Sequence, residues 1–337
     1  MSKTKPAPLA PGTSIGGYRI VRLLSTGGFG LVYLALDADG HEVAIKEYLP
    51  AALVTRRPGE RRPTVPEEKL SLYRLGLRSF FEEGRVLAQI SHPAVVDVLH
   101  FFRENDTVYL VIEYLRGASL QDFIVAARGR GGARVFREGT ILSLFDSVLR
   151  GLRVVHQHSL LHLDIKPANI FITDDDRAVL IDFGAAREVL RSEGSFVRPM
   201  YTPGFAAPEL YHRGARPQLG PWTDLYAIGA CMYACMRGQP PCEAVLRRDK
   251  DRLAVSLTRL RRVYSNHLVD LVQWCMALDP ASRPSSVFAL QRELIRVPWP
   301  ADHPPTATGA RRRWPLPLRW IMRRIDSVLG PKNPSAS

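Results

Sequence analysis

The chain changes from short strand-like segments to long helix-like segments near Gly117, and this change limits its fold more than any other feature of the 337 residues. Between Tyr18 and Lys46, β-type runs alternate with glycine-containing turns, which is typical of consecutive antiparallel strands. Two further β-type runs follow before residue 116, for a sheet of about five strands. Beyond Gly117, apolar residues recur at helical spacing. The sequence therefore predicts an α+β fold, with a small antiparallel β lobe before a larger, mostly helical lobe.

One segment interrupts the small lobe. Residues 50–66 hold four prolines and four arginines, which favours a loop. Residues 67–90 then show helical spacing that ends at Ser91, His92 and Pro93. We therefore expect one main helix in the small lobe, preceded by an arginine-rich insertion.

Composition favours a globular protein of a reducing compartment. The chain is 46% hydrophobic and 23% charged, with a formal net charge of +13 that favours anionic partners. The four cysteines lack the spacing of a zinc site and are interpreted as buried free thiols. The N-terminus has no apolar core of a secretory signal, and no run of eighteen apolar residues occurs. We expect a cytoplasmic location.

A glycine-rich segment lies between two predicted strands. Backbone amides at Gly27, Gly28 and Gly30 can close over phosphate oxygens without a side chain in the way, although a plain glycine hairpin would look the same. Thirteen residues after Gly30 comes Val43-Ala44-Ile45-Lys46, where strand alternation turns Lys46 away from its two β-branched neighbours. A lysine in this position can reach a bound phosphate.

These two segments resemble the glycine-rich loop and the lysine strand of protein kinases, and further motifs follow in the family's order. The segment 162–169 (HLDIKPAN) resembles the catalytic loop, residues 182–184 (DFG) the metal-binding triplet, and residues 207–209 (APE) the end of the activation segment. The resemblance covers about residues 18–297. It implies a two-lobed kinase domain, with residues 18–113 as the small lobe and 114–297 as the large lobe.

The resemblance also implies roles for individual residues. Phosphoryl transfer needs alignment of the nucleophile and neutralisation of charge more than covalent chemistry. Lys46 should hold the α- and β-phosphates of ATP and be held in turn by Glu83. Glu82 is the rival for that role, because adjacent helix residues face about 100° apart.

Four more groups complete the implied site. Asp164 should accept or orient the proton of the substrate hydroxyl, and Lys166 should stabilise the transferred phosphoryl group. Asn169 and Asp182 should coordinate magnesium, with manganese as the alternative cation. Further nucleotide contacts are implied for Gly27, Gly28, Gly30, Val32, Ala44, Glu113 and Leu115.

The acceptor class follows from the pattern after Asp164 together with Thr202 before Pro203, which resembles serine/threonine kinases. The segments GGFG, VAIKEYLP and VLIDFGAAR, with the insertion at residues 51–66, are similar to bacterial eukaryotic-like kinases. The resemblance implies protein substrates, ATP as the phosphate donor, and autophosphorylation.

Two positions depart from the family pattern. Ser25 replaces the first glycine of the loop, and Leu163 stands where most kinases carry an arginine before the catalytic aspartate. That arginine usually pairs with a phosphorylated activation loop. We therefore expect activity without phosphorylation of residues 185–206, although the segment offers Ser192, Ser195 and Thr202.

Three other motif residues are assigned to architecture. Glu209 and Arg283 resemble the structural ion pair of kinases, and Asp224 resembles the helix residue that braces the catalytic loop.

Both ends of the chain differ in composition from the rest. Residues 1–17 are interpreted as a flexible leader, and residues 298–337 as a proline-rich linker with a basic tail. Within Leu318–Leu329, apolar residues share one helical face. This face could dock on the large lobe, which we favour, or lie on an anionic membrane.

The main rival from another class is a pseudokinase that binds nucleotide or protein partners without transferring phosphate. It is disfavoured because Lys46, Asp164, Asn169 and Asp182 are all present. Specific nucleic-acid binding is weaker still, since the basic residues are dispersed and match no reading motif. A small-molecule phosphotransferase of the same fold is disfavoured by the APE segment. The sequence identifies no physiological substrate and no oligomeric state.

Overall fold

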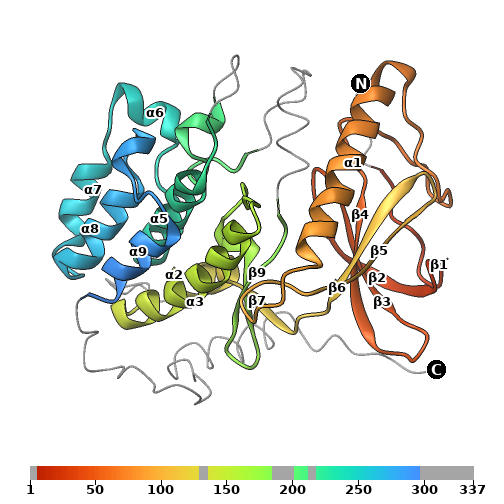
Figure 1. The fold of residues 1–337 in the computed structure, drawn as a ribbon, viewed down its shortest axis with the longest axis horizontal. Coiled ribbons are helices and arrows are strands. Elements are labelled where there is room, and N and C mark those ends of the chain that lie inside the picture. The colour runs from red at the N-terminus through yellow and green to blue at the C-terminus, as the bar shows by residue number, and fades with distance from the viewer. Residues whose placement is uncertain (1–5, 129–135, 184–200, 212–217, 297–337) are drawn as a thin grey trace. The chain divides into compact units, whose positions relative to one another are not determined.

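A computed structural model describes residues 6–128, 136–183, 201–211 and 218–296 of the chain (Figure 1). The chain divides into two compact units. Among the described residues, the small lobe is residues 6–115 together with Gln157–His162 and Phe183, and the large lobe is the remainder. Each lobe is described by itself.

The small lobe is built on a six-stranded antiparallel sheet with the order β1-β2-β3-β4-β6-β5. The strands are β1 (Ser14–Ile15), β2 (Tyr18–Thr26), β3 (Gly30–Leu36), β4 (Glu42–Tyr48), β5 (Val98–Glu104) and β6 (Thr107–Glu113). A short 3-10 turn, Glu67–Lys69, leads into helix α1 (Leu70–Leu87), which packs against β5 and β6. Helix α1 was predicted from the sequence as the main helix of this lobe.

Strand alternation places different side chains on the two faces of β4. Tyr48 turns toward α1, where its ring lies 5.6 Å from the ring of Tyr73 and 5.5 Å from that of Phe80. Glu47 turns to the opposite face and is fully buried there. A layer beyond the sheet must therefore cover this second face.

Residues 6–17 supply part of that layer and correct the prediction of a flexible leader for this stretch. Leu9 and Ile15 are only 4% and 1% exposed. Gly12 donates a backbone hydrogen bond to Ile20, and β1 pairs with β2 as a sixth strand that the sequence did not predict. The proline-rich composition suggested disorder, but two apolar side chains hold residues 6–17 against the sheet. Residues 1–5 lie outside the described part of the chain.

The insertion at residues 50–66 supplies the rest of the layer. It is a loop, as predicted, with an isolated bridge between Thr55 and Thr64. Leu53 and Val54 are each 2% exposed and belong to the same core cluster as the inner residues of the sheet. The insertion is therefore part of the small-lobe core.

The large lobe is mainly helical. The described helices are α2 (Leu120–Arg128), α3 (Glu138–Gln157), α5 (Pro221–Arg237), α6 (Ala244–Asp249), α7 (Leu253–Leu260), α8 (Asn266–Cys275) and α9 (Val287–Leu294). A small antiparallel sheet is formed by β7 (Gly117–Ser119), β8 (Ile170–Thr173) and β9 (Ala178–Leu180). Short 3-10 turns occupy Pro167–Asn169, Pro208–Tyr211 and Pro280–Ser282. The five long helical patterns of the sequence correspond to α2, α3, α5, α8 and α9, whereas α6 and α7 were not predicted.

Helix α5 forms the centre of this lobe. Every residue from Thr223 to Met236 is buried, and α5 packs against α8 so closely that Gly229 leaves no room for a side chain beside Cys275. Ser265 and Ser286 cap the N-termini of α8 and α9 by accepting backbone hydrogen bonds.

All four cysteines are free thiols. Cys231, Cys235 and Cys275 are buried, and burial raises the pKa of each. Cys242 is exposed, so the prediction of buried thiols is wrong for this residue. It follows Pro240 and Pro241 in a connection before α6, outside the apolar helix that buries its neighbours.

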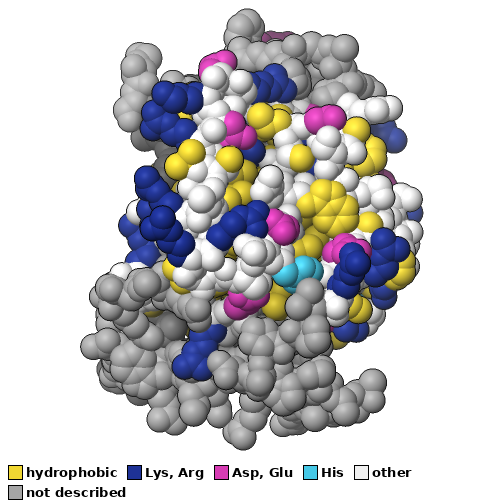
Figure 2. All heavy atoms as spheres, turned by 90° about the vertical axis from the view of Figure 1, so that its left-hand side faces the viewer, with side chains coloured by type: hydrophobic (Ala, Val, Ile, Leu, Met, Phe, Trp, Pro, Cys, Tyr) yellow, Lys and Arg dark blue, Asp and Glu magenta, His cyan; other side chains and the backbone are white. Residues whose placement is uncertain are grey.

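Figure 2 shows the face of the large lobe that carries α6 to α9, where basic side chains are interspersed with acidic and apolar ones. The larger exposed apolar residues of these helices are Leu246, Val255 and Phe288. None of the helices in the described ranges is both long enough and apolar enough to cross a lipid bilayer.

Candidate active site

The glycine-rich segment closes the turn between β2 and β3. The Gly27 amide donates to the Gly30 carbonyl oxygen at 2.9 Å. A side chain at Gly30 would lie 2.0 Å from the carbonyl oxygen of Glu47 on β4, whereas one at Gly27 would make only ordinary contact. Gly30 is therefore required by the close approach of two strands, a packing reason that the sequence did not reveal.

Lys46 lies next to this segment through strand pairing. It pairs with Val32 on β3 and with Leu110 on β6. Its ammonium group lies 5.3 Å from the ring centroid of Phe80 on α1. The half-buried lysine therefore turns to the face of the sheet that α1 covers, with Ala44 two residues earlier on the same face.

The structure distinguishes the two glutamates of α1. Glu83 is only 3% exposed. Glu82 is exposed and accepts a hydrogen bond from the side chain of Arg85 at 2.8 Å. Because a partner for Lys46 must lie on the buried face of the helix, this difference favours Glu83.

The end of β6 carries the other small-lobe candidates. The amide of Glu113 donates to the Asp97 carbonyl, and the Glu113 carboxylate accepts from the Asp97 amide at 3.2 Å. These bonds fix the end of the strand. Leu115, two residues on, is half-buried and is the last residue of the continuous small-lobe segment.

In the large lobe, two side chains converge on one carboxylate. Asp164 is 7% exposed, and its Oδ2 accepts hydrogen bonds from Lys166 Nζ and Asn169 Nδ2, each at 2.8 Å. Asn169 Nδ2 also lies 2.9 Å from the Asp164 carbonyl oxygen and 3.3 Å from that of Asp182. The 3-10 turn Pro167–Asn169 brings residues 164 and 169 together. The geometry holds the Asp164 carboxylate in one orientation.

This arrangement fits a divalent cation. The amide nitrogen of Asn169 is occupied with Asp164 and Asp182, which leaves its amide oxygen as the atom for a metal. Together with the Asp182 carboxylate, it offers the oxygen donors that hard cations prefer. Asp182 takes a left-handed backbone conformation, with φ of 60°.

The loop that carries Asp164 is held by α5. Asp224, 1% exposed, accepts the Leu163 amide at Oδ1 and lies 2.8 Å from His156 Nε2 at Oδ2. Leu163 has φ of 59°, a conformation that costs energy for a branched side chain. The Asp224 bond therefore helps to hold the loop. The sequence assigned the bracing role to Asp224 but missed His156, whose spacing carried no signal.

The predicted architectural ion pair is present. Arg283 donates to both carboxylate oxygens of Glu209, at 2.8 and 3.0 Å, and the Thr223 hydroxyl donates to the same carboxylate at 2.8 Å. The Arg283 side chain is fully buried.

A pocket lies beside Asp164 within the large lobe. Its lining includes Asp164, Ile165, Tyr201, Thr202, Phe205 and Thr223. The sequence singled out Thr202 but not Tyr201 or Phe205. Gly184, Ser192 and Ser195 lie outside the described residues.

Comparison with known proteins identifies the family. Residues 18–299 match the model of the protein kinase domain, so the chain belongs to the protein kinase family. It is 29% identical over 304 residues to the serine/threonine-protein kinase pkn2 of Myxococcus xanthus, covering 84% of this chain and 33% of that protein. It is 28% identical over 310 residues to the serine/threonine-protein kinase PknD of Chlamydia pneumoniae, covering 82% and 30%. The chain thus spans about a third of these relatives.

Solved structures agree. The chain superposes on the apo form of PpkA-294 with a TM-score of 0.74 and 31% identity, covering 85% of this chain and 99% of that one. The kinase domain of Mycobacterium tuberculosis PknI gives a TM-score of 0.59 at 23% identity, covering 86% and 99%, which supports the fold alone. These matches confirm the resemblance to bacterial eukaryotic-like kinases and the two-lobed fold predicted from the sequence.

Proposed function

We propose that this chain transfers the γ-phosphate of ATP to serine and threonine hydroxyl groups of proteins, including its own. The observation that carries the proposal is the convergence of Lys166 and Asn169 on the Asp164 carboxylate, with Asp182 beside Asn169. Relatives from two bacteria are named serine/threonine-protein kinases, which supports the same acceptor class.

Each residue has a physical task in this proposal. Asp164 orients the acceptor hydroxyl and takes its proton, because its carboxylate is held in one orientation by Lys166 and Asn169. Lys166 lies beside that carboxylate. There its positive charge would stabilise the negative charge on the transferred phosphoryl group. Lys46, supported by Glu83, binds the α- and β-phosphates.

The remaining candidates bind the nucleotide or the metal. Asn169 and Asp182 would hold magnesium, or manganese in its place, and the cation would neutralise charge on the phosphates. The amides of Gly27, Gly28 and Gly30 would face the phosphates. Val32, Ala44, Glu113 and Leu115 would contact the rest of the nucleotide.

Activity without activation-loop phosphorylation is part of the proposal. Leu163 carries no charge, so it cannot pair with a phosphate. Its backbone is held instead by the Asp224 carboxylate, a bond that does not depend on residues 185–206. Ser192→Ala/Ser195→Ala should therefore retain turnover, and a folded but inactive double variant would contradict this point.

The scaffold alternative predicts binding without transfer. Intact mass of the purified chain with magnesium-ATP, alone and with a generic basic protein, separates the two, beside Asp164→Asn and Asp182→Ala. Added phosphate in the wild type alone supports the kinase. No added phosphate in any sample, with nucleotide still bound, would support the scaffold.

Location and tail contacts stay as predictions. The free thiols favour the cytoplasm. The tail, residues 298–337, lies outside the described residues, and we favour its docking on the large lobe over contact with an anionic membrane. Co-sedimentation of the full chain with anionic liposomes, with and without the tail, tests this choice.

A further inference from the structure

A buried carboxylate lies directly after the nucleotide-binding lysine. Glu47 follows Lys46 on β4 but points to the opposite face of the sheet, where it is fully buried. The Tyr33 hydroxyl on β3 donates to Glu47 Oε2 at 2.7 Å, and the Tyr109 hydroxyl on β6 donates to Oε1 at 3.0 Å. Neither the sequence motifs nor the proposed chemistry assigns a role to this glutamate.

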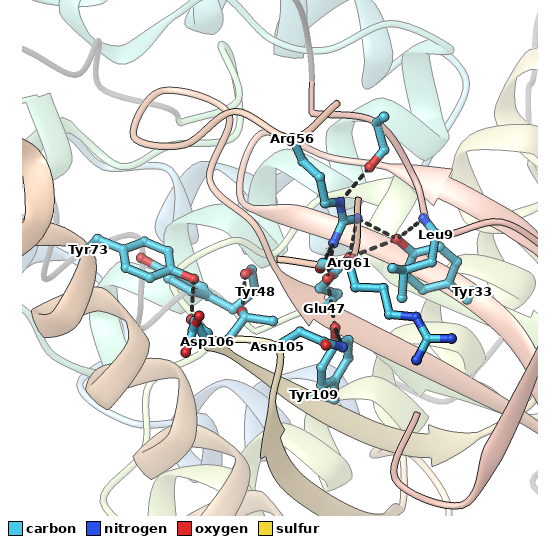
Figure 3. Close-up of polar contacts among 12 residues, drawn as sticks. Leu9, Tyr33, Glu47, Tyr48, Arg56, Arg61, Tyr73, Asn105, Asp106 and Tyr109 are labelled. Atoms are coloured by element: carbon cyan, nitrogen blue, oxygen red, sulfur yellow. Dashed lines mark hydrogen bonds and ion pairs between the residues drawn. The ribbon is translucent and has the colours of Figure 1, made fainter. Parts of the chain in front are cut away.

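The partner of Glu47 comes from the insertion at residues 50–66. Arg56 donates from Nη1 to Glu47 Oε1 at 2.5 Å and from Nη2 to Oε2 at 2.8 Å, and both side chains are completely buried (Figure 3). Arg56 also donates from Nε to the Ala7 carbonyl oxygen at 2.8 Å and from Nη2 to the Tyr33 hydroxyl at 3.1 Å. The guanidinium fork thus joins the insertion and the N-terminal segment to the sheet.

The residues between Glu47 and Arg56 bind the glycine-rich segment. The Leu49 amide donates to the Phe29 carbonyl oxygen at 2.9 Å, and the Ala51 amide donates to the Gly28 carbonyl oxygen at 3.1 Å. Residues 49–55 are therefore fixed at one end by β4 and at the other by Arg56. Between these ends they hold two peptide groups of the turn that should cover the phosphates.

A buried ion pair is a weak explanation for stability alone, because well-packed apolar residues often stabilise a core as well or better. Its directional bonds fix geometry instead. We propose that Glu47 and Arg56 are positioning residues that hold the glycine-rich segment in its nucleotide-binding shape through the backbone of Leu49 and Ala51. The inference rests on the proposed binding of ATP by this segment.

A segment held in its binding shape before ATP arrives loses less conformational freedom when ATP binds. Loosening the anchor should therefore weaken ATP binding more than it slows the chemical step, because Asp164 and Lys166 belong to the other lobe. The expected signature is a raised KM for ATP with a nearly unchanged kcat.

Arg56→Lys is the primary variant, since it keeps the positive charge and removes the fork. Arg247→Lys is the matched control. Arg247 is 3% exposed, close to the 4% of Arg56, and it donates twice to a carboxylate, that of Asp251, and once to a tyrosine hydroxyl. Unlike Arg56, it lies in the large lobe. For Arg56→Lys, we expect the KM for ATP to rise roughly three- to tenfold, which corresponds to a loss of ATP affinity of at most about tenfold. For Arg247→Lys, we expect no change in KM.

Hydrogen exchange in nucleotide-free protein supplies a second readout. The Leu49 and Ala51 amides should exchange faster in Arg56→Lys, whereas they should keep the wild-type rate in Arg247→Lys. If Arg56→Lys does not fold, Glu47→Leu/Arg56→Met replaces both charges with apolar groups and carries the same readouts.

Unchanged KM and unchanged exchange in a folded variant would overturn the inference. So would equal acceleration of exchange in the Arg247→Lys control, which would indicate general loosening. If the wild type transfers no phosphate, the proposed function fails by itself. ATP affinity by calorimetry, together with amide exchange, would then still decide the positioning role.

Discussion

The buried pair between Glu209 and Arg283 allows a quantitative prediction. Arg283 donates to both Glu209 oxygens and to three backbone carbonyls, those of Ala277, Leu278 and Trp222. Among the residues that the structure describes, Arg283→Met would leave the Glu209 carboxylate with only the Thr223 hydroxyl as a donor. Breaking a buried ion pair from one side costs about 3–5 kcal/mol. We therefore expect a loss of about 4 kcal/mol in the free energy of unfolding, because an uncompensated charge stays buried.

The measurement is urea-induced unfolding followed by tryptophan fluorescence, with a thermal scan beside it. For a domain of this size, each kcal/mol lowers Tm by about 2–4 °C, so Arg283→Met should lower Tm by roughly 10 °C. Glu209→Leu/Arg283→Met removes both charges and should lose less than the single variant. Arg292→Met removes a pair between an exposed arginine and the half-buried Glu293, and it should change stability by at most about 1 kcal/mol.

Two results would refute this reasoning. One is a loss below about 1 kcal/mol in Arg283→Met, which would mean that water or a rearrangement solvates the abandoned carboxylate. The other is a double variant that is as unstable as the single one, which would place the cost in lost packing.

Three further predictions follow from packing and protonation. Gly30→Ala should destabilise the small lobe by about 1–3 kcal/mol, since its new side chain would overlap the Glu47 carbonyl, while Gly27→Ala should fall well below that in a thermal scan; equal losses would contradict the packing argument. A thiol reagent should label one cysteine, Cys242, in the native chain and four in denaturant, as counted by intact mass; a second rapid native label would show that a buried thiol is accessible. Burial raises the pKa of Tyr73 to about 12. The neutral Tyr73 hydroxyl therefore contributes to the free energy of unfolding on the order of 2–3 kcal/mol, which is fully present below about pH 10 and is lost as pH rises toward 12. Between about pH 10 and 12, the free energy of unfolding of Tyr73→Phe should fall less steeply with pH than that of the wild type. An equal slope in the two proteins would exclude ionisation of Tyr73 as the cause.

The lobes and their order could be predicted because they rest on local patterns. Strand-like runs, glycine turns and helical spacing are each legible within about twenty residues, and they predicted the sheet, α1 and the longer helices. Helices α6 and α7 are short, and residues 244–260 carry charges at positions that obscure the helical spacing. Tertiary packing, not periodicity, decides such helices.

The candidate site also has a part that local sequence predicts and a part that only the structure decides. Asp164, Lys166 and Asn169 lie within six positions, so their contacts depend on one loop and one 3-10 turn. The choice between Glu82 and Glu83 depended on helix phase, and burial of Glu83 now favours the second.

By itself, the sequence determined the family, the order of the motifs and the residues that carry the proposed chemistry, because each motif is a short run whose residue types suit one task. Only the tertiary structure decided that residues 6–17 are packed and that Gly30 is required by β4. The same is true of the pair between Glu47 and Arg56. Its network joins residues up to 62 positions apart, Glu47 and Tyr109, which meet only because β4 and β6 pair in one register. Contacts of that kind depend on strand pairing and on which side chains exclude water, and no local pattern encodes either.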